Sequence, residues 1–104
     1  DRLDGHIVQG HVDQIAECVS IDENGGSYIM TFTYEKSNNV TVEKGSICVN
    51  GISLTVCNSQ ENSFSVAIIP YTWQNTNLKK IKIGDTVNLE FDIVGKYIAK
   101  LLTK

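Results

Sequence analysis

The amino-acid sequence predicts an all-β protein, either a closed antiparallel barrel or a sandwich of short strands. Apolar and polar residues alternate over several segments, which is the pattern of strands with one face in a core and one face outside. These segments are separated at regular spacing by turn signals that contain glycine, as in barrels and sandwiches.

The first two strand signals lie before residue 35. Around residues 15–21 the alternation is irregular, since Ile15, Val19 and Ile21 fit it less cleanly than later residues do. The run Asn24-Gly25-Gly26 predicts a hairpin turn, because these residues tolerate the positive φ angles of tight turns. Residues 28–34 then alternate clearly, with four apolar residues on one face.

The most informative segment covers residues 44–56, with the sequence KGSICVNGISLTV. It begins at a turn, alternates, breaks at Asn50-Gly51 and resumes. Asn-Gly predicts a turn or a bulge, and such an irregularity lets main-chain groups face a ligand instead of a neighbouring strand. Ser53 and Thr55 stand two residues apart, so both hydroxyls lie on one face. We expect this face to suit a flat, polar, neutral heterocycle.

The second half of the chain contains two strand signals and two helix signals. Residues 64–69 and 87–93 alternate, and Gly84-Asp85 predicts another hairpin-type turn. A short helical turn is expected within residues 70–77. Near the end, an amphipathic stripe at helical spacing predicts a helix that must pack on another surface. The stripe consists of Val94, Tyr97, Ile98, Leu101 and Leu102.

Length and composition limit the function classes. A chain of 104 residues is expected to form one domain with one ordinary core. The net charge of −3 gives no basic patch, so nucleic acid is not an expected partner. No apolar run approaches the ~20 residues of a membrane helix. Three cysteines without a CxxC spacing favour a reducing compartment, and we expect a cytoplasmic protein. Two histidines without carboxylates or thiolates at ligand spacing predict no metal site.

Four segments resemble the riboflavin synthase family, in the family's order and over nearly all of the chain. They are residues 5–13 (GHIVQGHVD), 44–56, 68–78 (IIPYTWQNTNL) and 84–92 (GDTVNLEFD). The first is similar to the second, C-terminal barrel of the enzyme. The resemblance implies a six-stranded antiparallel Greek-key barrel over residues 1–93, with a short helix after a strand, and a C-terminal oligomerisation helix over 94–104. Because the chain begins at Asp1, at the family's joint between barrels, we expect a fragment of a longer protein.

The family transfers a four-carbon unit between two molecules of 6,7-dimethyl-8-ribityllumazine. The products are riboflavin and 5-amino-6-(D-ribitylamino)uracil, and no cofactor is required. The resemblance implies one lumazine per barrel, an active site completed by the N-terminal barrel of a neighbouring subunit, and a homotrimer when full length. The isolated fragment is expected to bind ligand and to turn over poorly. The alternatives are a non-catalytic lumazine- or riboflavin-binding antenna protein and a plain β-barrel interaction module.

The resemblance also implies the site residues. Among the catalytic candidates, His11, Ser53 and Thr55 would hold the ring and move protons. The fourth candidate, Asp92, would approach the site of a neighbouring subunit. The implied substrate-binding residues are Gly10, His11, Val12, Lys44, Ser53, Leu54, Thr55, Ala67, Ile68, Ile69, Pro70, Tyr71 and Thr72.

Several of these residues have a structural interpretation as well. His11 would then be a surface histidine at a strand end, Lys44 a solvated turn lysine, and Asp92 a solvated strand carboxylate. The family often has Glu or His where this chain has Tyr71, and usually Leu where it has Trp73, which either covers the pocket or packs on the barrel. The cysteines are expected to be buried and unreactive. They are Cys18, Cys48 and Cys57.

Overall fold

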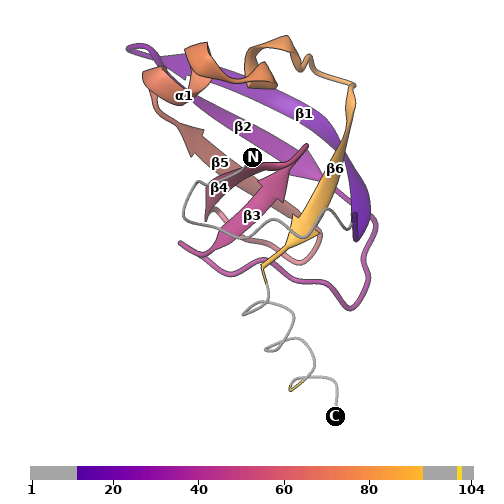
Figure 1. The fold of residues 1–104 in the computed structure, drawn as a ribbon. Helices are drawn as coiled ribbons and strands as arrows, with labels where there is room; N and C mark the ends of the chain where they lie inside the picture. The colour runs from indigo at the N-terminus through magenta and orange to yellow at the C-terminus, as the bar shows by residue number, and fades with distance from the viewer. Residues whose placement is uncertain (1–11, 93–100, 102–104) are drawn as a thin grey trace.

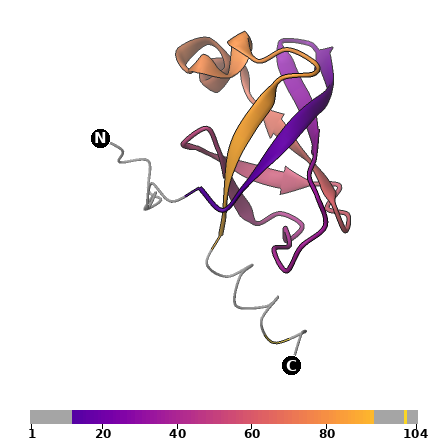
Figure 2. The ribbon, with the colours of Figure 1, turned by 90° about the vertical axis from the view of Figure 1, so that its right-hand side faces the viewer.

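The structure is a computed structural model that describes residues 12–92 and residue 101, and its strands close into an antiparallel barrel (Figures 1 and 2). The strands are β1 (Gln14–Asn24), β2 (Ser27–Thr33), β3 (Ser46–Val49), β4 (Ile52–Cys57), β5 (Ser63–Ile68) and β6 (Thr86–Phe91). Their order around the barrel is β1-β2-β5-β4-β3-β6, so the chain crosses over between β2 and β3. The predicted six-stranded antiparallel Greek-key barrel is confirmed.

The core is built from the inward faces that the alternation predicts. On β2, Met30 and Phe32 are fully buried, and on β5 the same holds for Phe64 and Val66. Tyr34, just after β2, meets Phe91 of β6 edge-on, with ring centroids 5.4 Å apart. Burial of apolar side chains of this size stabilises a fold by roughly 1.5 to 3 kcal/mol each. The barrel interior is therefore a packed core and leaves ligand binding to the outer faces and the ends.

The irregular pattern of the first strand has a structural cause. The register between β1 and β2 shifts between Cys18 and Ser20, which is a β-bulge at Val19. Before the bulge, Ala16 and Cys18 face the core, and after it Ile21 packs against the core. One extra residue reverses the alternation, because successive strand side chains point to opposite faces.

The hairpin turn predicted at Asn24-Gly25-Gly26 is confirmed, and the turn or bulge predicted at Asn50-Gly51 is a hairpin turn. Gly25 and Gly26 join β1 to β2, and Asn50 and Gly51 join β3 to β4, all four with positive φ between 50° and 91°. Positive φ at both central residues is the geometry of a type I′ turn, which matches the twist of the flanking strands. The prediction for Gly84-Asp85 is wrong in one respect. Gly84, with φ 99°, does turn the chain, but it leads from a helical segment into β6 and joins no two strands of a hairpin.

The short helix predicted after a strand is confirmed as α1 (Pro70–Asn75), which follows β5. A 3₁₀ helix that the sequence did not predict, η1 (Asn77–Lys80), continues from it. The two segments lie across one end of the barrel, where Leu78 is fully buried (Figure 2). Helix α1 has no fully buried residue, but the Trp73 ring stacks on Tyr28 of β2 with centroids 3.7 Å apart.

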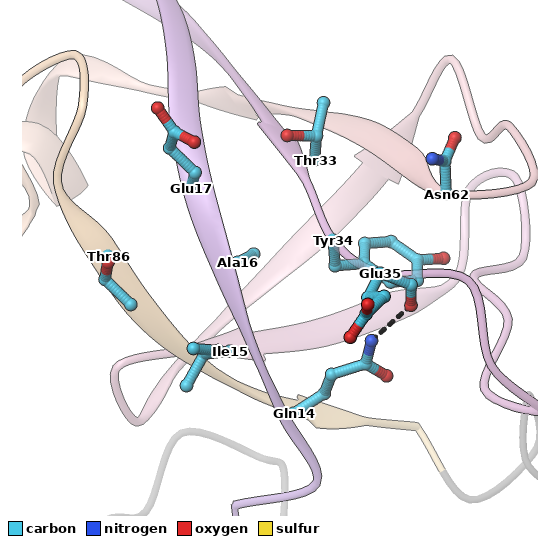
Figure 3. Close-up of a pocket in the computed structure, with 9 residues that line it drawn as sticks. All are labelled: Gln14, Ile15, Ala16, Glu17, Thr33, Tyr34, Glu35, Asn62 and Thr86. Atoms are coloured by element: carbon cyan, nitrogen blue, oxygen red, sulfur yellow. Dashed lines mark hydrogen bonds between the residues drawn. The ribbon is translucent and has the colours of Figure 1, made fainter.

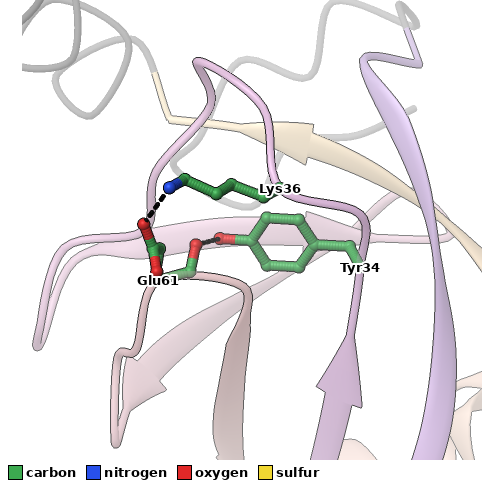
Figure 4. A network of polar contacts seen from close by, with 3 residues as sticks. All are labelled: Tyr34, Lys36 and Glu61. Atoms are coloured by element: carbon green, nitrogen blue, oxygen red, sulfur yellow. Dashed lines mark hydrogen bonds and ion pairs between the residues drawn. The ribbon is translucent and has the colours of Figure 1, made fainter.

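Hydrogen bonds and one ion pair hold the segment between β2 and β3 against residues 58–61, which connect β4 to β5. The Glu43 carboxylate accepts hydrogen bonds from the main-chain N–H groups of Asn58 and Ser59, at 3.1 and 2.8 Å. The Tyr34 hydroxyl donates to the carbonyl of Glu61 at 3.5 Å, and the Glu61 carboxylate pairs with Lys36 at 2.6 Å (Figure 4). Because both charged side chains are exposed, this ion pair contributes little to stability.

The predicted C-terminal helix lies outside the described residues, except for Leu101. The division of the chain into a barrel over residues 1–93 and an oligomerisation helix over 94–104 therefore stays a prediction.

Candidate functional site

The β3–β4 hairpin places the two hydroxyl candidates on the outer face of the barrel. Leu54 and Val56 of β4 are buried in the core, so Ser53 and Thr55 point outward, the first half-buried and the second exposed. Across the ladder, Ser53 pairs with Cys48 of β3, and Thr55 pairs with Ser46. The expectation that both hydroxyls share one face is confirmed. Leu54, an implied ligand residue, offers only its main chain to the outside.

At the Asn50-Gly51 turn, the Asn50 N–H is bonded to the barrel and is not available to a ligand. The Asn50 N–H donates to the carbonyl of Asn88 on β6, and the Asn88 N–H donates to the Asn50 side-chain oxygen, both at 2.8 Å. These two bonds extend the β3–β6 pairing beyond the end of β3. The turn therefore serves the barrel and fixes the hairpin that carries Ser53.

Strand β5 supplies the next part of the predicted site. Ser65 pairs with Cys57 of β4, and Ala67 lies two residues further along the same outer face, as Thr55 does on β4. Ala67 is exposed, whereas Ile68 is 1% exposed and belongs to the core. Ser65 is buried, and its hydroxyl shares a hydrogen bond of 2.7 Å with Thr31 of β2. Beside Thr55, β5 thus contributes a small, flat surface without a bulky side chain.

The end of β5 and the start of α1 present an exposed edge. Ile69 is 60% exposed and Tyr71 is 73% exposed, which is high for side chains of this size. Pro70, also exposed, starts α1 at a position where its missing N–H costs no hydrogen bond. Thr72 is half-buried, and its carbonyl accepts a bond of 2.7 Å from the Thr76 hydroxyl. Ala67 therefore continues the outer face that Ser53 and Thr55 begin, and the residues from Ile69 to Thr72 follow it in the chain at the end of β5.

Lys44 lies at the opposite end of the β3–β4 pair from the hairpin turn. It has φ 67° in the turn before β3, and its N–H donates to the carbonyl of Val56 at 2.8 Å. Its side chain is exposed. The turn places Lys44 beside the Ser46–Thr55 pair, at the edge of the face that carries the hydroxyl candidates.

Val12 and Asp92 lie on the side of β6. Val12 is 52% exposed and lines a pocket of about 320 Å³ with Cys48, Asn50 and Glu90, among others. Cys48 pairs with Ser53 on one side and with Glu90 on the other. This row of paired residues therefore connects the pocket with the outer face that carries Ser53 and Thr55. Asp92 follows β6 and is half-buried. Gly10 and His11 lie outside the described residues.

The thiols fit the expectation of low reactivity, with one correction. Cys18 and Cys48 are buried, but Cys57 is only half-buried, in the outer row beside Ser65. Burial raises the pKa of the Cys18 thiol, and burial together with the nearby Glu43 carboxylate raises the pKa of the Cys57 thiol. A raised pKa keeps the thiol protonated near neutral pH, which disfavours nucleophilic chemistry.

The sequence did not predict a pocket of about 430 Å³ on the β1 side of the barrel (Figure 3). Its rim includes the outward residues Ile15 and Glu17 of β1 and Thr86 of β6. The Gln14 side-chain amide donates a hydrogen bond to the carbonyl of Glu35. This bond connects β1 at the pocket rim with the segment that follows β2. None of the described residues of the predicted site lines this pocket.

Residues 12–92 and 101 contain no group of three or more His, Cys, Asp or Glu side chains placed to hold a metal ion. Within the same residues, no helix has the length and apolar character needed to cross a membrane.

Sequence comparison relates the chain to known riboflavin synthases. The chain is 47% identical to a riboflavin synthase of Actinobacillus pleuropneumoniae, 42% to one of Saccharomyces cerevisiae and 38% to one of Bacillus subtilis. These matches cover 95 to 99% of the chain and 44 to 48% of each relative, so the chain spans about half the length of the curated relatives it matches. The family described as "Lumazine binding domain" matches residues 9–92. The chain belongs to the lumazine binding domain family.

Proposed function

We propose that the outer face around Ser53 and Thr55 binds one molecule of 6,7-dimethyl-8-ribityllumazine or riboflavin. The observation that carries this proposal is the one-sided hydroxyl pair on β4, which lies beside the flat surface of Ala67 and the exposed edge from Ile69 to Thr72. A planar heterocycle needs such a flat surface, and its carbonyl and ring nitrogen atoms need hydroxyl and main-chain partners at the rim.

In the full-length protein, the proposed activity is that of a riboflavin synthase. Two lumazines face each other, one gives up a four-carbon unit, and the other accepts it to become riboflavin. Positioning two substrates in contact supplies much of the acceleration in such a reaction. A methyl group of the ring must also lose a proton, and hydrogen-bond donors aimed at the ring carbonyls stabilise the resulting anion. Ser53, Thr55 and His11 are the proposed partners of the ring.

The assembly is part of the same proposal. The second lumazine is held by an N-terminal barrel of a neighbouring subunit, which Asp92 approaches, and the full-length protein is a cytoplasmic homotrimer. The relatives' greater length supports this view, since the described barrel offers one such hydroxyl face and the chain spans about half of each relative. Isolated residues 1–104 are therefore expected to bind ligand with little turnover.

Ligand binding is tested by fluorescence titration of the isolated domain with riboflavin and with the lumazine. Thr55→Val is expected to weaken binding roughly 5- to 150-fold, because a desolvated polar partner contributes about 1 to 3 kcal/mol. Thr86→Val is the matched control. Both threonines are exposed strand residues whose side chains make no hydrogen bond with another described residue, but Thr86 lies on β6 at the β1-side pocket. Equal affinities of both variants and the unchanged domain would reject the proposed face.

Catalysis is tested in the full-length protein. His11→Ala and Ser53→Ala are expected to lower the rate of riboflavin formation more than they lower the melting temperature. If the unchanged full-length protein binds lumazine but produces no riboflavin, the alternative of a non-catalytic antenna protein is correct. Leu101→Asp is expected to dissociate the trimer, which sedimentation measures. An intact oligomer with a lower melting temperature would instead mean that the C-terminal segment packs on its own barrel.

A further inference from the structure

A third pocket lies at the end of the barrel that α1 and η1 cover. It has a volume of about 710 Å³ and opens between the tip of the β3–β4 hairpin and the segment from Gln74 to Lys80. Figure 1 shows α1 and the adjoining turn at this end of the strands. The lining residues are Asn50, Ile52, Gln74, Asn75, Thr76, Asn77, Lys79 and Lys80.

Among the described residues, the lining is rich in hydrogen-bond donors and contains no acidic side chain. It combines four carboxamides, one hydroxyl and two ammonium groups, in a chain whose net charge is −3. No Asp or Glu lies among these residues, so the two lysine charges are not neutralised within the pocket. In an acidic chain, a pocket with positive charge alone is a local electrostatic feature that favours an anion.

The walls of this pocket are held in place by bonds that leave donors available. The Lys79 ammonium donates to the carbonyl of Gln74 at 3.1 Å, and the Asn75 amide donates to the carbonyl of Tyr71 at 2.8 Å. The Asn50 side-chain oxygen is bonded to the Asn88 N–H, so its NH₂ group is the end left for another partner. The Lys80 side chain makes no hydrogen bond or ion pair with another described residue.

We propose that this pocket binds a phosphate monoester. A phosphate monoester carries close to two negative charges near neutral pH and three terminal oxygens that accept hydrogen bonds. Two lysines match that charge, and the carboxamide NH₂ groups of Asn50, Gln74 and Asn77 match the oxygens. A carboxylate would satisfy one lysine and half of these donors, which makes it the weaker match.

The pocket adjoins the face proposed for the heterocycle. Ile52 of the pocket directly precedes Ser53, and Gln74 stands two residues after Thr72. A ring on the outer face would therefore extend its side chain toward this end of the barrel. Applied to flavins, the inference rests on the proposed function. It states that the domain binds a flavin with a phosphorylated side chain more tightly than it binds riboflavin.

The test compares riboflavin with flavin mononucleotide, which differ by one phosphate, in fluorescence titrations of the folded domain at low ionic strength. We expect the mononucleotide to bind about tenfold more tightly, and salt to reduce this difference. Lys79→Gln and Lys80→Gln are expected to weaken mononucleotide binding about three- to tenfold each and to leave riboflavin binding unchanged. Lys82→Gln, an exposed lysine outside the pocket, is the matched control and should change neither affinity.

The outcomes separate this inference from the proposed function. Equal affinities for the two flavins, or an equal loss in Lys82→Gln and Lys80→Gln, would overturn the inference while flavin binding itself stands. If neither flavin binds, the proposed function fails. Titration with inorganic phosphate then tests separately whether the pocket binds a phosphate group. Saturable shifts of the Asn77 and Lys80 amide resonances that disappear in Lys80→Gln would support the pocket, and unsaturable or absent shifts would refute it.

Discussion

The stack between Tyr28 and Trp73 is the contact on which the position of α1 depends. Helix α1 has six residues, none of them fully buried, and no side-chain cap at its N-terminus. A helix this short is unstable without tertiary contacts. The two rings lie 3.7 Å apart between centroids at 12°, and both side chains pack partly against the core. We therefore predict that Trp73→Leu weakens both stability and ligand binding.

The magnitude follows from the geometry of the pair. A stacked aromatic pair contributes about 0.5 to 1.5 kcal/mol beyond the area it buries. Because Trp73 is only partly buried, the loss of apolar area in Trp73→Leu adds at most about 1 kcal/mol. The expected decrease in the free energy of unfolding is about 1 to 2 kcal/mol, which lowers the melting temperature by roughly 4 to 15 °C in a domain of this size.

A double-mutant cycle isolates the stacking contribution. Trp73→Leu, Tyr28→Leu and the double variant are compared in thermal and urea unfolding, with Tyr28→Phe as a control that keeps the ring. We expect a coupling energy of about 0.5 to 1.5 kcal/mol and almost no effect of Tyr28→Phe. Ligand affinity should decrease in both Leu variants, since Thr72 moves with the helix. Strictly additive effects, or unchanged affinity in the destabilised variants, would refute this role of the stack.

Three further predictions concern stability. Gly51→Ala should destabilise the domain by about 1 to 2 kcal/mol in urea unfolding, because φ is +83° there although no atom lies within 4 Å of the added methyl. The free energy of unfolding should decrease as the pH rises above about 8.5, since the folded state raises the pKa of the Cys18 thiol and the unfolded chain loses that proton first. Cys18→Ala should flatten this alkaline decrease. Glu61→Gln, which breaks the exposed pair with Lys36, should leave the melting temperature almost unchanged.

Most of the barrel could be predicted from the sequence because its signal is local. Phe64, Val66 and Ile68 alternate with polar or small residues along β5, and the Asn50-Gly51 turn has the one residue pair that most favours its geometry. The bulge at Val19 could not be predicted, because one inserted residue is specified by pairing with β2 and not by local preference. The 3₁₀ helix η1 was missed for a similar reason, since Leu78 is ordered by burial at the end of the barrel.

Some features of the candidate site could likewise be predicted from the sequence, and others could not. The shared face of Ser53 and Thr55 follows from the two-residue period of a strand, and the structure confirms it. The cross-strand row from Ser53 through Cys48 to Glu90 depends on the register between Cys48 and Glu90, which are far apart in the sequence, and no local pattern encodes that register. The pocket lined by Lys79 and Lys80 is likewise formed by two segments that are distant in the sequence, and only the fold brings Asn50 near Lys80.

The Asn50-Gly51 turn links the fold to the proposed recognition. Its sequence first indicated main-chain groups free for a ligand, but Asn50 gives its N–H and its side-chain oxygen to β6. These bonds fix the hairpin at its tip, while Lys44 and Gly45 bond to Val56 near its open end. A hairpin held at both ends presents Ser53 and Thr55 at fixed positions, so less side-chain and backbone entropy is lost when a ligand binds. The same bonds leave the Asn50 NH₂ group at the pocket lined by Lys79 and Lys80, so one turn residue stabilises the barrel and borders the proposed phosphate site.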